Sequence, residues 1–82
     1  MTYVPPPKNL PAFQNAVRTK SKTRTKCGGL LKRWKDEEFI YEWDTLHGRV
    51  EKYDKQGRHL GEFDSKTGKQ TKEPNPSRRV EP

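Results

Sequence analysis

The aromatic residues of this chain are concentrated in one stretch, and that concentration limits what the chain can fold into. Six of the eight lie between Trp34 and Phe63. The stretch consists of short β-favouring runs separated by turn residues, and it has no helical periodicity. Because only 27% of the 82 residues are hydrophobic, a chain of this size can build one small core. We therefore expect a mainly β fold with its core in this stretch.

Alternating residues predict three strands here. Phe39, Tyr41 and Trp43 alternate with residues that include two acids, which is typical of a strand with one aromatic face. We expect further strands at residues 49–53 and 59–64, joined by turns at 45–48 and 54–57, and a third turn with Gly68 at positive φ. Shorter runs at residues 30–35 and 69–72 would extend this antiparallel sheet to about five strands.

Residues 1–29 differ in composition and are expected to form a proline-rich, basic arm beside a core of residues 30–82. Four prolines in residues 1–11 favour an extended backbone. Phe13 and Val17 are four residues apart, which predicts a short helical segment before the chain breaks at Gly28 and Gly29. Three prolines in residues 72–82 predict an extended carboxy-terminal tail.

The positive charge of the chain is concentrated in its first part. Residues 1–35 contain nine Lys and Arg and no acid, whereas residues 36–82 contain nine Lys and Arg against eleven acids. A soluble basic tail is one interpretation. Contact with a nucleic-acid backbone is the other, and it predicts binding that weakens steeply with salt. The expected RNA-binding residues in this run are Arg18, Lys20, Lys22, Arg24 and Lys26.

Other classes of protein are disfavoured by what the sequence contains. Cys27 is the single cysteine, so we expect neither an internal disulfide nor a multi-cysteine zinc site. No apolar run approaches the length of a membrane span or a signal-peptide core, and we expect no stable membrane association of this domain. We predict no cofactor and no bound metal.

Asp44, His47 and Glu51 form the most distinctive cluster of reactive side chains, because they fall within eight residues of an otherwise basic chain. Two carboxylates and an imidazole are the groups that metal-independent RNA cleavage would use. One removes the proton of a ribose 2'-hydroxyl and another protonates the departing 5'-oxygen. A hairpin through residues 45–48 would bring the three together, with Asp44 and Glu51 facing one another.

Two other interpretations of this cluster remain open. Asp, His and Gly are common in turns, and a glutamate among lysines is often only solvated. The spacing also has the ligand types of a metal site, although one histidine and two acids in an exposed hairpin are a weak signature.

Several motifs carry a resemblance to a known family. The segments KRW, IYEWD, HGRVEKY, GRHLGEFDSKTG and PNPSR occur in the order, and at nearly the spacing, of the cytotoxic ribonuclease domain of cloacin and the ribosome-cleaving E-group colicins. The chain resembles this domain over residues 32–79. The resemblance implies a small, highly twisted antiparallel sheet with a short amino-terminal helical segment. It also implies a metal-independent endoribonuclease that cuts small-subunit ribosomal RNA in the decoding site and stops translation.

The resemblance also assigns roles to individual residues. Glu51 would be the general base on the 2'-hydroxyl and His47 the general acid, with their exchange left open. Asp44 would orient His47 or favour its positively charged form. Arg78 would stabilise the transition state, with Arg79 as the alternative for that role. Further RNA contacts are expected from Tyr53, Arg58 and Arg79, and from His59 if it is more than a hydrogen-bonded surface group.

Partners follow from the same resemblance. It implies the ribosome as target, an acidic cognate immunity protein, and a larger bacteriocin or contact-dependent delivery protein of which this chain is the payload. Such a protein is released or displayed by its producer and acts in the cytoplasm of the target bacterium. DNA, which lacks the 2'-hydroxyl, would not be cut. Two alternatives remain, namely cleavage of transfer RNA by the same fold and a basic RNA-binding module without catalysis.

Overall fold

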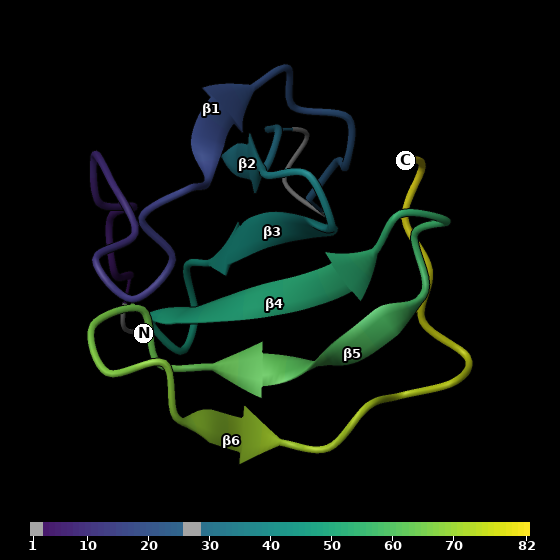
Figure 1. Cartoon of the computed structure of the whole chain (residues 1–82). Coiled ribbons are helices and arrows are strands. Elements are labelled where there is room, and N and C mark those ends of the chain that lie inside the picture. Colours follow the sequence, from purple (N-terminus) through teal and green to yellow (C-terminus); the bar gives the residue numbers. More distant parts are fainter. Residues whose placement is uncertain (1–2, 26–28) are drawn as a thin grey trace.

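Six antiparallel strands form one sheet in a computed structural model that describes residues 3–25 and 29–82. Their order in the sheet follows their order in the chain (Figure 1). The strands are β1 (Val17–Thr19), β2 (Arg33–Lys35), β3 (Phe39–Asp44), β4 (Arg49–Asp54), β5 (His59–Phe63) and β6 (Gln70–Lys72). The prediction of a mainly β, antiparallel fold is confirmed. The strand predicted at residues 39–44 has the observed bounds, and the others differ by one to three residues at their ends.

The short amino-terminal helical segment is not present in the described residues, and that prediction is wrong. The chain turns at this place through hydrogen bonds from Phe13 N to Leu10 O and from Ala16 N to Phe13 O. Val17 then begins β1, opposite Lys35. Its side chain is 66% exposed, so it does not share an apolar face with Phe13. Pairing with β2 therefore overrides the local helical spacing, and it adds the sixth strand.

One face of the sheet carries the apolar core, and the amino-terminal segment covers it. Buried Leu10 packs there with side chains of β2, β3 and β4, among them Trp34, Tyr41, Trp43 and Val50. Backbone hydrogen bonds, including one from Val4 N to Thr45 O, fasten the segment to the sheet. Residues 4–16 thus supply part of the core that so small a sheet could not complete alone.

The opposite face of the sheet is polar yet mostly buried. Glu42, Glu51 and Glu62 lie side by side on β3, β4 and β5, and each is at most 4% exposed. The carboxy-terminal segment, yellow in Figure 1, returns past the turn between β4 and β5. It is held there by the hydrogen bond from Val80 N to Gly57 O. Buried charges need partners, and the candidate site is built from the partners of these glutamates.

Within the described residues, no helix has the length and apolar character that crossing a membrane would require. The predictions that concern Lys26, Cys27 and Gly28 lie outside these residues.

Candidate functional site

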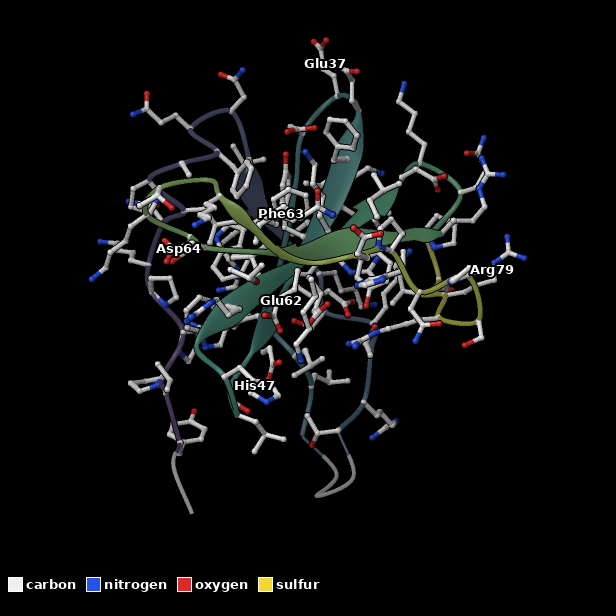
Figure 2. The ribbon with its side chains drawn as sticks, turned by 90° about the horizontal axis from the view of Figure 1, so that it is seen from below. Glu37, His47, Glu62, Phe63, Asp64 and Arg79 are labelled. Carbon is white, nitrogen blue, oxygen red and sulfur yellow. The ribbon has the colours of Figure 1, made fainter. Side chains whose placement is uncertain are left out.

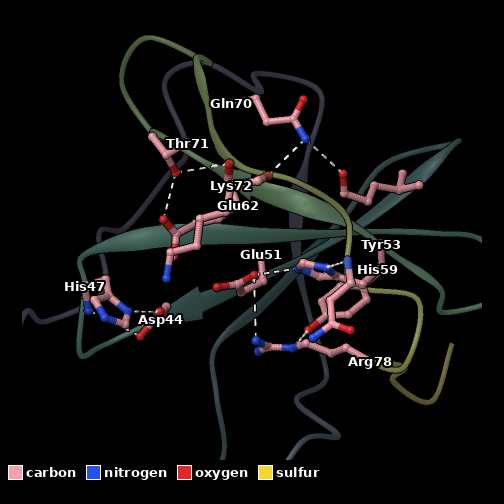
Figure 3. A network of polar contacts seen from close by, with 12 residues as sticks. Asp44, His47, Glu51, Tyr53, His59, Glu62, Gln70, Thr71, Lys72 and Arg78 are labelled. Atoms are coloured by element: carbon pink, nitrogen blue, oxygen red, sulfur yellow. Dashed lines mark hydrogen bonds and ion pairs between the residues drawn. The ribbon is translucent and has the colours of Figure 1, made fainter.

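The turn between β3 and β4 holds Asp44 and His47 together (Figure 3). Asp44 Oδ2 lies 2.7 Å from His47 Nδ1, and Asp44 Oδ1 accepts hydrogen bonds from the N–H groups of Leu46 and His47. Burial is the largest influence on the pKa of Asp44 and raises it, but the hydrogen bonds from His47 and the backbone together outweigh burial and lower the pKa below 3.8. Asp44 is therefore a carboxylate that orients the ring of His47, which is 56% exposed.

Glu51 lies in the middle of β4 and contacts His59 of β5. Its Oε1 is 2.7 Å from His59 Nε2, next to the bulge between these strands. The other ring nitrogen, Nδ1, accepts a hydrogen bond of 2.9 Å from the backbone N–H of Asn75. A ring nitrogen that accepts carries no proton, so the proton of the neutral ring is on Nε2 and is donated to Glu51. This chain of contacts fixes the orientation of the Glu51 carboxylate.

Arg78 reaches the same carboxylate from the carboxy-terminal segment. Its Nη1 lies 3.8 Å from Glu51 Oε1, and its Nε donates to the hydroxyl of Tyr53 at 2.9 Å. Burial raises the pKa of Tyr53 to about 12, although Arg78 opposes the shift. Burial also acts to lower the pKa of Arg78, but Tyr53 and Glu51 reverse this and the pKa is raised. Arg78 thus remains a cation, with 43% of its side chain exposed.

Two groups of residues lie on the same face of the sheet. One consists of Asp44 and His47, and the other consists of Glu51, His59 and Arg78. The prediction that Asp44 and Glu51 face each other is wrong, because Asp44 pairs with Arg49 and Glu51 pairs with Glu42. The two carboxylates are instead diagonal neighbours, two positions apart along the strands. The hairpin therefore brings the predicted residues to one face without direct contact between all of them.

The predicted RNA-binding residues are distributed over the surface. The side chains of Arg18, Lys20, Lys22 and Arg24 are exposed on β1 and in the segment that follows it, and Lys26 lies outside the described residues. Arg58 and Arg79 are also exposed and pair across an isolated bridge, with Arg79 extending outward in Figure 2. Tyr53 is fully buried, so in this structure it contacts Arg78 and offers no surface to RNA.

Sequence reasoning missed the role of His59, which it placed among possible surface groups. The partners of this ring are eight residues before it and sixteen residues after it. No local motif joins Glu51, His59 and Asn75, so only the pairing of β4 with β5 and the return of the tail could identify the contact. Glu62 was also missed, because a lone glutamate in an alternating strand gives no signal of burial.

The arrangement provides the elements of acid–base chemistry on a phosphodiester. Glu51 is a carboxylate aimed by a neutral histidine, His47 is an exposed imidazole oriented by a carboxylate, and Arg78 supplies positive charge between solvent and Glu51. A base, an acid and a cation are the groups needed to move two protons and to stabilise an anionic phosphorus centre.

Three known proteins are similar to this chain in sequence. The chain is 50% identical to colicin E3 of Escherichia coli over 56 residues, or 65% of the chain. It is 42% identical to cloacin of Escherichia coli over 84 aligned positions, which cover 95% of the chain, and 46% identical to colicin-E6 over 56 residues. The chain spans only 10–15% of the length of these relatives.

A family model described as Cytotoxic matches residues 4–81 of the chain. It includes every strand of the sheet and all the residues of the candidate site. The chain therefore belongs to the Cytotoxic family, and its resemblance to the cytotoxic ribonuclease domain of cloacin and the E-group colicins is confirmed.

Proposed function

We propose that this chain is a toxin endoribonuclease that cuts small-subunit (16S) ribosomal RNA in the decoding site and so stops translation. The observation that carries the proposal is the setting of Glu51, a buried carboxylate that is aimed by His59 and lies 3.8 Å from Arg78. Membership of the Cytotoxic family and the similarity to cloacin and two colicins support it.

The proposed reaction uses the nucleophile that RNA already contains. Glu51 takes the proton of a ribose 2'-hydroxyl, and the resulting oxygen attacks the adjacent phosphorus. The bond from phosphorus to the 5'-oxygen breaks, and His47 gives a proton to that oxygen. The products are a 2',3'-cyclic phosphate and a 5'-hydroxyl, so the atoms balance without another reactant. DNA is not a substrate because it lacks the attacking hydroxyl.

Asp44 and Arg78 support the two proton transfers in different ways. Asp44 accepts from Nδ1 of His47 and leaves Nε2 as the nitrogen that delivers the proton. Arg78, held by Tyr53, stabilises the negative charge that develops on the phosphate oxygens as the 2'-oxygen attacks. The exposed cations Arg18, Lys20, Lys22, Arg24, Arg58 and Arg79 are proposed to contact the RNA backbone.

The test of this function is cleavage of RNA in intact ribosomes by the purified chain, followed on a denaturing gel. We expect one short fragment from the 3' end of the small-subunit RNA, with unchanged yield in EDTA. Glu51→Gln should abolish the fragment, and His47→Ala should reduce the rate by about 10²–10⁴. Binding without cleavage would contradict catalysis, and shortened transfer RNA with intact ribosomal RNA would move the proposal to that substrate.

The assignment of acid and base has its own test. A model RNA of the decoding site, with sulfur in place of the bridging 5'-oxygen, has a leaving group that needs no protonation. If His47 is the general acid, His47→Ala should cut this RNA about as fast as the unaltered chain does, whereas Glu51→Gln should not. If Glu51→Gln cuts this RNA as fast as the unaltered chain and His47→Ala does not, Glu51 is the general acid and His47 is the general base.

We propose partners of the same kind as the sequence implied. A chain with a net charge of +7 would associate quickly with an acidic immunity protein in the producing cell. The chain would be the payload of a longer bacteriocin or contact-dependent delivery protein, as the 10–15% coverage of its relatives suggests. Delivery from outside would bring it to the ribosomes in the cytoplasm of the target bacterium.

A further inference from the structure

Three buried glutamates lie in a row across the polar face, and they differ in how their charge is compensated. Glu42 receives hydrogen bonds from Thr23 at 2.5 Å and from the guanidinium of Arg33 at 2.8 Å. Glu51, the middle member, has His59 at 2.7 Å and Arg78 at 3.8 Å, as described above. Each of these two carboxylates thus faces a cation or a strong donor from a neighbouring element.

Glu62, the third member, has the most exposed of the three cations as its partner. Its Oε1 accepts from the hydroxyl of Thr71 at 2.7 Å, but within the described residues its Oε2 is buried and has no hydrogen-bond partner. The cation beside it is Lys72, whose Nζ lies 3.8 Å away on a side chain that is 60% exposed. A carboxylate that is 95% buried, with one oxygen that accepts no hydrogen bond and an exposed ammonium 3.8 Å away, favours additional positive charge.

Asp44 and His47 lie next to the carboxylate of Glu62. One ligand atom from each of the three residues lies within 4.8 Å of the other two. Figure 2 shows Glu62 extending from the sheet toward His47, and the pairing of Glu62 with Glu51 places it on the face that carries Asp44. The cluster brings together side chains from β3, the following turn and β5, so it depends on the tertiary fold.

We propose that Asp44, His47 and Glu62 bind a divalent transition-metal cation of the Zn²⁺ type, and that the bound ion inhibits the ribonuclease. Two carboxylates and one imidazole are ligands that such ions accept, at about 2.0–2.2 Å. Rotation of the exposed His47 ring and displacement of the Lys72 ammonium would allow the ligand atoms to close around the ion. The ion would add positive charge beside the buried carboxylate of Glu62, and it would withdraw His47 from proton transfer.

Binding is tested on the folded chain without any RNA, by calorimetric titration with Zn²⁺. Glu62→Gln should lower the affinity by at least about tenfold, because it removes a charged ligand. Glu73→Gln, which changes an exposed glutamate beyond β6, is the matched control and should bind as tightly as the unaltered chain. Lys72→Met should raise the affinity, because it removes the ammonium that competes for Glu62. Because Lys72 is exposed, the affinity of Lys72→Met for Zn²⁺ tests the site even if Glu62→Gln does not fold.

The two histidines provide an internal comparison by nuclear magnetic resonance of their ring nitrogens. Zn²⁺ should shift the ring signals of His47 and leave those of His59 in place, because both nitrogens of His59 are engaged by Glu51 and Asn75. Failure to bind Zn²⁺, affinity unchanged in both Glu62→Gln and Lys72→Met, or shifts at His59 alone would each overturn the site.

The proposed inhibition by the bound ion rests on the proposed ribonuclease function, and it is measured separately from binding. For each variant, the rate of ribosome cleavage with Zn²⁺ is divided by the rate without Zn²⁺. This ratio should be smallest for Lys72→Met, intermediate for the unaltered chain and closest to one for Glu62→Gln. Equal ratios in all three would show that the site does not inhibit. If the unaltered chain cleaves no RNA at all, the proposed function fails while the binding result still stands.

Discussion

The side chain of Glu51 is only 5% exposed, although it is proposed to take a proton from RNA. Its surroundings reconcile burial with this role. His59 donates one hydrogen bond to it, and the backbone of Asn75 keeps the other ring nitrogen from rotating away. A base that is aimed before the substrate arrives loses less entropy in the reaction. The residues that hold such a base therefore matter as much as the base itself.

Tyr53→Phe is predicted to slow cleavage by about 10- to 100-fold, since a small misplacement of a catalytic group has effects of this size. The change removes the hydroxyl that holds Arg78 Nε at 2.9 Å and keeps the buried ring. The loss of one hydrogen bond should cost about 1 kcal/mol of unfolding free energy. Single-turnover cleavage of ribosomes and urea unfolding measure the two effects.

Tyr41→Phe is the matched control for that substitution. Tyr41 is also buried, but its hydroxyl donates to Asp36 at 2.6 Å on the opposite face of the sheet. A similar loss of stability with an unchanged rate of cleavage is expected. Equal losses of activity in the two variants would mean that Tyr53 acts through general stability and has no specific role in placing Arg78.

At the scale of elements, turns that begin with an aspartate define where the strands end. Asp44, Asp54 and Asp64 each accept hydrogen bonds from backbone N–H groups two and three or four residues later. A glycine at positive φ completes each turn, namely Gly48, Gly57 and Gly68. The prediction of positive φ at Gly68 is confirmed. Such turns fix the register of the hairpins, and hence which side chains reach the polar face.

These turns are predicted to make stability depend on pH in the acid range. Backbone N–H donors, first that of Arg58 for Asp54 and that of Thr67 for Asp64, lower the pKa of both carboxyls below the ordinary 3.8. A lowered pKa in the folded state means that the stabilisation is complete above the ordinary value. It is lost as the pH falls through the folded value. Unfolding free energy should therefore fall on acidification below about pH 4.

The double variant Asp54→Asn, Asp64→Asn tests this origin by urea unfolding between pH 6 and pH 2.5. Asparagine keeps an acceptor oxygen but does not titrate, so the acid-dependent loss should become shallower. Glu73→Gln with Glu81→Gln, which removes two exposed acids of the tail, should leave the dependence unchanged. An unaltered slope in the first variant would assign the acid sensitivity to other groups.

Gly57→Ala is predicted to displace the carboxy-terminal segment. Gly57 has φ of 85°, and a Cβ there would overlap the carbonyl oxygen of Val80. The left-handed backbone alone should cost about 1–2 kcal/mol, and movement of the segment would shift Arg78 and reduce cleavage. Gly29→Ala is the control, since a Cβ there meets only Thr25 Oγ1 at 3.8 Å. Cleavage by Gly57→Ala at the normal rate would show that Arg78 tolerates the displacement.

At the scale of the whole molecule, charge separates the two parts of the chain. The exposed cations on β1 and after it belong to a segment without acids, whereas all the acids lie at residues 36–82. A basic surface attracts a polyanion by release of the polyanion's counterions. The same surface would attract an acidic inhibitor, so binding of RNA and neutralisation should both weaken with salt.

Binding to ribosomes is predicted to weaken linearly on a plot of log affinity against log salt. Replacing Arg18, Lys20, Lys22 and Arg24 by glutamine should reduce the slope by roughly 0.7–0.9 for each phosphate contact that is lost. Filter binding of the Glu51→Gln chain, which should not cut the RNA, measures this. Replacing Lys55, Lys66 and Lys69, exposed in other turns, should change the slope less. Equal changes would remove the special role of the first basic run.

Local patterns predicted the short strands at residues 39–44, 49–53 and 59–64, because alternation and turn chemistry are properties of neighbouring residues. The sequence also singled out Asp44, His47, Glu51 and Arg78 through its motifs. The helical segment before Val17 failed as a prediction because strand pairing with Lys35 outweighs the weak preference of one turn.

Which distant groups share the polar face depends on how the strands and the tail come together in the fold. Burial of Glu51 and Glu62, the tautomer of His59 and the tether of Arg78 on Tyr53 all depend on strands and a tail that are separated along the chain. A buried carboxylate is stable only beside partners, and sequence order does not state which partners folding will bring. For that reason local patterns predicted the strands and the reactive groups, while their contacts had to come from the fold.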